Sequence, residues 1–157
     1  MMIKGFLERK FDPPAPFIKA VVVSQSLNVS GLVDFHVDTG ASASIILDKD
    51  LRYLRLDVAG LKRAERDVGG IGGLIKTYVI EDAALMFRTA DGSVVEERLK
   101  LLVGSHDLRK LDAESRRLMM VIPSLLGRDI LGRFRLVYDE RSDQVYLERQ
   151  ASRLRLK

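Results

Sequence analysis

The segment FHVDTGASASIIL, residues 35–47, places an aspartate where an apolar strand ends. Apolar and polar residues alternate over residues 33–37, which predicts a strand with one buried face. The strand runs directly into Asp38, and Thr39 and Gly40 follow. Because Asp-Thr-Gly is also ordinary turn chemistry, this segment alone leaves a turn and a functional carboxylate equally open.

A glycine cluster, VGGIGGLIKT at residues 68–77, follows about 30 residues further along. Glycine adopts positive φ and allows another backbone to come close, so the cluster marks a tight turn or a loop beside a ligand. A phosphate-binding loop would need a glycine where Ile75 stands and would open a helix, whereas the residues that follow are strand-like. We therefore expect the tip of a β-hairpin at residues 69–73.

A third segment, SLLGRDIL at residues 124–131, lies in the C-terminal part of the chain. In this order, the three segments resemble the active-site loop, the flap tip and the start of the C-terminal helix of retropepsin-like (retroviral-type, single-lobe) aspartic proteases. The resemblance covers about residues 17–148. It implies a mainly β fold, a retropepsin-like acid-protease β-barrel monomer with a β-hairpin flap and a short C-terminal helix.

The resemblance also implies roles for single residues. Asp38 would hold the nucleophilic water, Thr39 would hydrogen-bond across a dimer beneath the aspartates, and Gly40 would let the substrate backbone approach. Substrate contacts would come from the active-site loop and the flap, at Ala41, Ser42, Gly69, Gly70, Ile71, Gly72 and Gly73.

Two residues of the third segment would support the active site. Arg128 resembles a buried arginine that ties the C-terminal helix to the active-site loop. In the viral enzymes an aspartate commonly stands at the position of Ser42, so Arg128 needs another partner here. Asp129 and a backbone carbonyl are the two candidates.

Amide hydrolysis at moderate pH needs a base that activates water and an acid that protonates the leaving nitrogen. Two adjacent carboxylates that share one proton provide both. The chain has one Asp-Thr-Gly in 157 residues, so the second Asp38 must come from a second chain across a two-fold axis. We expect a homodimeric aspartic endopeptidase that cleaves extended peptides or unfolded proteins without a metal or other cofactor. The alternative is a catalytically silent retropepsin-like module that dimerises or binds peptides.

The rest of the chain predicts further strands around these segments. Apolar runs bounded by turn residues predict strands or hairpins at residues 17–24, 32–37, 43–46, 61–68, 74–88, 94–103, 121–127 and 134–148. A short helix is expected after residue 46, a surface helix or structured loop at 106–120, and one helical turn at 127–134. We expect one domain over residues 1–157, with its core at about 17–148 and a basic tail at 149–157.

Composition excludes several other chemistries. The chain has no cysteine and two histidines, which disfavours disulfides, thiolate catalysis and zinc sites. His36 is expected on the outer face of its strand, and Ser105, His106 and Asp107 are expected in a polar loop because consecutive residues cannot form a catalytic triad. Charges near the N-terminus and the lack of a long apolar run predict a cytoplasmic protein with no membrane partner, and no nucleic-acid partner is expected.

Overall fold

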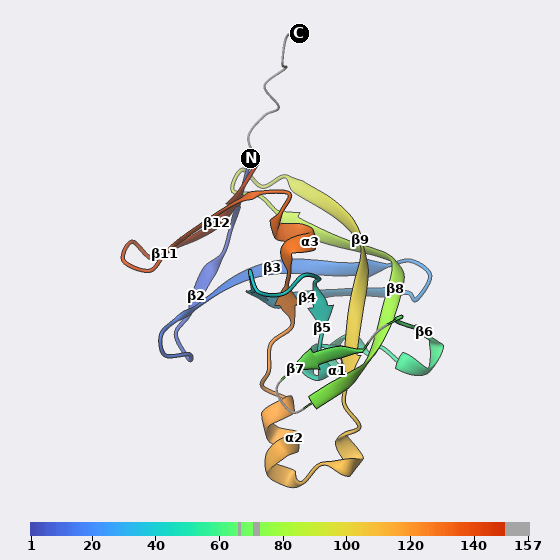
Figure 1. Cartoon of the computed structure of the whole chain (residues 1–157). Coiled ribbons are helices and arrows are strands. Elements are labelled where there is room, and N and C mark those ends of the chain that lie inside the picture. The colour runs from blue at the N-terminus through green and yellow to red at the C-terminus, as the bar shows by residue number, and fades with distance from the viewer. Residues whose placement is uncertain (66, 71–72, 150–157) are drawn as a thin grey trace.

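The computed structural model describes residues 1–65, 67–70 and 73–149 (Figure 1). The described chain is mainly β. Its strands are β1 (Met2–Lys4), β2 (Phe6–Glu8), β3 (Ala15–Ser24), β4 (Val29–Val37), β5 (Ile45–Ile46), β6 (Lys62–Arg63), β7 (Val68–Gly70), β8 (Gly73–Arg88), β9 (Val94–Ser105), β10 (Leu125–Leu126), β11 (Arg135–Asp139) and β12 (Gln144–Glu148). Its helices are α1 (Asp48–Leu54), α2 (Ala113–Met119) and α3 (Arg128–Leu131), with 3-10 turns η1 (Val58–Gly60) and η2 (Leu108–Lys110).

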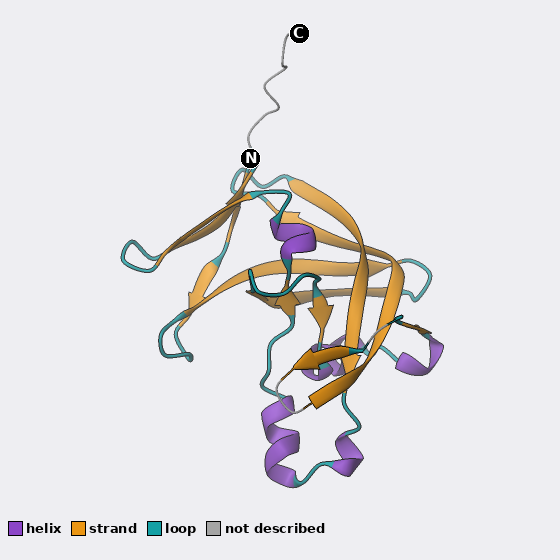
Figure 2. Ribbon diagram, in the orientation of Figure 1, coloured by secondary structure: helices purple, strands orange, loops and turns teal. Residues whose placement is uncertain are grey.

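The larger sheet has the strand order β2-β3-β4-β10-β5-β9-β8-β6. Because β3 also pairs with β8, the strands from β3 round to β8 form a closed ring, and Figure 2 shows them wrapping around one interior. A smaller sheet, β1-β12-β11, joins both ends of the described chain. The predicted β-barrel is therefore present, and β7 and β8 form a hairpin beside it.

The barrel core follows the alternation of the sequence. In β4 the side chains of Val33, Phe35 and Val37 are buried, and in the neighbouring β3 Ile18 is buried opposite Phe35 and Ala20 opposite Val33. Burial of each such valine, isoleucine or phenylalanine side chain contributes about 1.5–3 kcal/mol to folding. This row of apolar side chains fixes the register of β4, and with it the place where Asp38 leaves the sheet.

Three strand predictions need correction. Among the described residues, the strand expected at 61–68 is present only at Lys62–Arg63 and at Val68, where β7 begins. The structure has strands before residue 17, because β1 pairs with β12 and Ile3 is buried opposite Leu147 in the core. The strand expected at 121–127 is reduced to Leu125–Leu126. Pro123 has no N–H to give to a sheet, which ends regular pairing on its side.

Arg149 is part of the folded structure, whereas the sequence assigned it to a basic tail. Its guanidinium forms an ion pair with Glu97 and lies 4.4 Å from the ring centroid of Phe134. Glu97 is 8% exposed in its side chain and also pairs with Arg133 at 2.8 Å. The C-terminal strand is thus tied to β9 by a nearly buried carboxylate with two cationic partners, while residues 150–157 lie outside the described residues.

The stretch 106–120 forms η2 and α2, as predicted, and lies at the end of the molecule away from the two termini (Figure 1). Asp112 caps α2 by accepting a hydrogen bond from the Ser115 backbone N–H. No helix in the described ranges is long and apolar enough to cross a membrane.

Candidate active site

Asp38 stands at the end of β4, where the short strand β10 pairs in parallel with β4. Its backbone N–H donates to the carbonyl of Leu126 at 3.1 Å, which continues the pairing one residue past the strand. Its Oδ1 accepts the backbone N–H of Gly40 at 2.8 Å, and its carbonyl accepts that of Ala41 at 3.2 Å. The carboxylate is therefore held by the loop that follows it.

Arg128 joins α3 to the active-site loop, as the resemblance implied. Its Nη1 donates to the carbonyl of Thr39 at 2.7 Å, and its backbone N–H donates to the carbonyl of Ala41 at 2.9 Å. The partner is thus the carbonyl and not Asp129. The expected burial is wrong for the single chain, because the Arg128 side chain is exposed.

Asp129 instead holds the far end of the same loop. Both of its carboxylate oxygens accept the backbone N–H of Ser44 at 3.0 Å, and Oδ1 also accepts the Ser44 hydroxyl at 2.7 Å. Ser44 is fully buried, and its Oγ accepts the N–H of Gly127 at 2.9 Å. A Cβ at Gly127 would lie 2.5 Å from the carbonyl carbon of Ala43, so only glycine fits beneath this loop.

A groove of about 670 Å³ lies in front of Asp38. Gly40, Ala41 and Ser42 of the predicted site line it, whereas Thr39 does not and is exposed. The remaining lining is mostly apolar and comes from Phe11, His36, Ala43, Ile45, Leu47, Val68, Ile75, Leu102, His106, Ile122, Pro123 and Leu125. The groove thus combines one carboxylate with mostly apolar walls, as ligand sites commonly do.

The β7–β8 hairpin forms one wall of the groove. Val68 and Ile75 are paired across the two strands, and both line the groove. The predicted glycines Gly69, Gly70 and Gly73 lie further along the same ladder, with Gly70 opposite Gly73. Ile71 and Gly72, also predicted to contact substrate, lie outside the described residues.

His36 lines the groove next to Asp38, although the sequence analysis gave it no role. Its ring packs against Phe17 at 5.3 Å and Phe11 at 6.4 Å between centroids. Burial lowers the pKa of His36 below its ordinary value, and the nearby charge of Asp38 acts in the opposite direction. The alternation correctly placed this side chain opposite the core, but the Phe11 segment that covers it could not be located from periodicity.

His106 is a second groove residue that the sequence analysis missed. Its backbone N–H donates to Asp48 Oδ1 at 3.0 Å, and its ring Nδ1 is hydrogen-bonded to Asp48 Oδ2. The Asp48 side chain is only 5% exposed, so a buried carboxylate holds the imidazole in place. Asp48 and His106 are far apart in the sequence, and only the pairing of β5 with β9 brings them together.

Among the described residues, no cluster of three histidines or carboxylates could hold a metal ion. The site therefore consists of Asp38, its supporting loop, and a groove whose walls carry two histidines.

Comparison with known proteins identifies the fold that carries this site. No protein-family model matches the chain, and no curated protein matches it. Among solved structures, a retropepsin-like aspartic protease from Rickettsia conorii is 23% identical with a TM-score of 0.50, over 94% of this chain and 88% of that one. The protease of EIAV, in complex with an inhibitor, is 19% identical with a TM-score of 0.44, over 75% of this chain and 86% of that one. The first likeness, together with the closed ring and α3, shows that the chain has a retropepsin-like fold.

Proposed function

We propose that the protein is an aspartic endopeptidase that works as a homodimer, with Asp38 and the same residue of a second copy activating one water molecule. The observation that carries the proposal is the position of Asp38, at the end of β4 and beside a mostly apolar groove of about 670 Å³. The retropepsin-like fold is consistent with the proposal, but fold alone does not establish activity, so the site must carry it. A single carboxylate cannot act as acid and base at once, so the mechanism requires the second copy.

In this proposal one carboxylate of the pair takes a proton from the water, and the other donates a proton to the leaving nitrogen. The Gly40 N–H, which is hydrogen-bonded to Asp38 Oδ1, orients that carboxylate, and Arg128 holds the loop through the Thr39 carbonyl. The β7–β8 hairpin serves as the flap that covers a bound peptide and excludes water. The substrate is an extended peptide or unfolded protein, and the cytoplasmic location remains a prediction.

Subunit mixing tests the shared site. Asp38→Asn is mixed with an equal amount of wild-type chain, and the two are allowed to exchange. If two copies of Asp38 form one site, about a quarter of randomly paired dimers keep both, and activity per wild-type chain falls to about half. A wild-type chain that keeps full activity in the mixture would show that one chain suffices, which contradicts the proposal.

Light scattering provides the matching physical measurement. The wild-type chain is expected to have the mass of a dimer at micromolar concentration. Asp38→Asn should have the same mass, because the substitution keeps the size of the side chain and the backbone contacts of the loop. A dimeric wild type that binds peptides yet cleaves none would instead favour the catalytically silent module.

A further inference from the structure

A second cavity of about 360 Å³ lies near the Asp38 groove, and His106 lines both. Lys76 on β8 lies opposite Ser105 on β9, and Tyr78 shares their face of the sheet. Ile75, next to Lys76, lines the Asp38 groove instead. Strand β8 therefore runs between the two cavities, with Ile75 facing the groove and Lys76 facing the second cavity.

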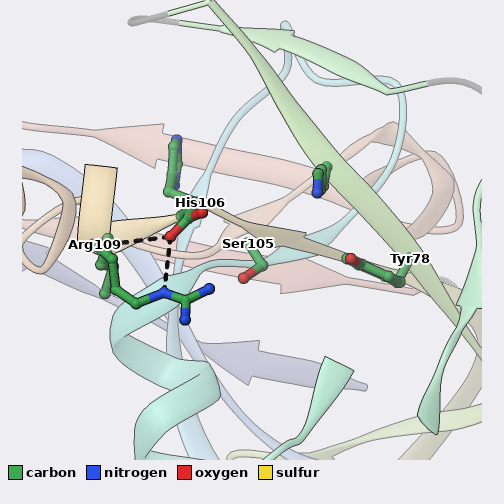
Figure 3. Close-up of a pocket in the computed structure, with 7 residues that line it drawn as sticks. Tyr78, Ser105, His106 and Arg109 are labelled. Atoms are coloured by element: carbon green, nitrogen blue, oxygen red, sulfur yellow. Dashed lines mark hydrogen bonds and ion pairs between the residues drawn. The ribbon is translucent and has the colours of Figure 1, made fainter. Parts of the chain in front are cut away.

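The second cavity is lined by hydrogen-bond donors that have no partner in the described part of the chain. These are the Lys76 ammonium, the hydroxyls of Tyr78 and Ser105, and the Nη atoms of Arg109. In Figure 3 Tyr78 points toward Ser105, and Ser105 points toward the guanidinium of Arg109. Donors with two permanent positive charges around one hollow favour an oxyanion as ligand.

One carboxylate, Asp107, also lines this cavity, and it already has cationic partners. Its Oδ1 accepts from Arg109 Nε at 3.4 Å and from the Arg109 backbone N–H at 3.3 Å. Its Oδ2 lies 3.9 Å from the ammonium of Lys110, outside the cavity lining. Asp107 therefore holds Arg109 through its Nε, while the Arg109 side chain, 93% exposed, stays in solvent at the edge of the cavity.

We propose that this second cavity is a subsite for an acidic side chain of the peptide that lies in the Asp38 groove. The inference rests on the proposed function, because it takes the groove to be the peptide site. His106, fixed by the buried Asp48, borders both the groove and the subsite. A glutamate carboxylate would accept hydrogen bonds from Lys76 and Arg109. A glutamine of the same size is neutral, so its hydrogen bonds to these two cations would be weaker.

Peptide binding to the Asp38→Asn chain tests the subsite without cleavage. Fluorescent peptides of about ten residues, with amidated C-termini, carry a single glutamate or glutamine that is moved through the sequence. Fluorescence anisotropy gives each Kd. At one position glutamate is expected to bind about fivefold or more tightly than glutamine. In the same chain with Lys76→Met and Arg109→Met added, the two peptides should bind within about twofold of each other.

Lys110→Met is the matched control, because it removes a neighbouring positive charge that does not line the cavity. It should preserve the preference for glutamate. Equal binding of glutamate and glutamine peptides at every position, or a preference that survives the double substitution, would overturn the proposal. A peptide without glutamate but with a free C-terminal carboxylate distinguishes a terminal carboxylate from a side chain as the ligand. Because binding is measured without cleavage, this result is separate from the outcome of the activity tests.

Discussion

Removing the Asp129 carboxylate should destabilise the protein much more than removing an exposed one. In Asp129→Ala, the backbone N–H and the hydroxyl of the fully buried Ser44 both lose their acceptor. Each unsatisfied buried group costs about 1–3 kcal/mol, so the expected loss in free energy of unfolding is about 2–6 kcal/mol. The Ile130 N–H also donates to Asp129 Oδ1 at 2.9 Å, but its loss costs less, because the same N–H donates to the carbonyl of Gly127 at 3.2 Å.

Urea unfolding at one fixed protein concentration measures this difference, since the stability of a dimer depends on concentration. Asp34→Ala is the matched control, because Asp34 is 43% exposed and forms a surface ion pair with Lys19 worth at most about 1 kcal/mol. If Asp129→Ala does not fold, Asp129→Asn still provides a value, because its amide oxygen keeps one acceptor. A loss for Asp129→Ala no larger than that for Asp34→Ala would refute the role of Asp129 as the anchor of the active-site loop.

Three further predictions concern other parts of the scaffold. Gly127→Ala should lower the midpoint of thermal unfolding sharply, because its Cβ would meet backbone at 2.5 Å, whereas Gly60→Ala, with open space around it, should not. Burial raises the pKa of Glu97, but its two arginine partners outweigh this and lower it, so its contribution to stability should be lost as the pH falls through the acidic range. Glu97→Gln should flatten that pH dependence in urea titrations, and an unchanged slope would contradict it. Gly70→Val should reduce turnover without changing the mass of the dimer by light scattering, and unchanged turnover would argue against a working flap.

The sequence predicts the scaffold of the site well where local patterns decide it. Alternation in β4 correctly placed Phe35 in the core and Asp38 at the strand end, and turn residues correctly placed the hairpin at 90–93. A hairpin is present at the glycine cluster as predicted, but its first arm is β7, where Gly69 and Gly70 are themselves paired with β8, and not the predicted stretch 61–68.

Contacts between distant segments could not be predicted in the same way. His106 acquires its partner Asp48 only through the pairing of β5 with β9, and nothing in either segment alone indicates it. The ion pair of Arg149 with Glu97 likewise depends on how the terminal sheet packs against β9. From the sequence alone, the basic residues from Arg149 onward are typical of a solvated tail. Only the fold shows that Glu97 binds the first of them, Arg149.

In the proposed mechanism Asp38 performs the chemistry, and a comparison of cleavage by three variants of the chain tests this role. Wild type, Asp38→Asn and Asp34→Asn are each incubated with a denatured protein at pH about 4–6, where a paired carboxylate can hold one proton. Asp34 lies on the same strand but does not line the groove, so its variant controls for the loss of one carboxylate from β4. We expect cleavage by wild type and Asp34→Asn and none by Asp38→Asn. Cleavage that persists in Asp38→Asn would contradict the account.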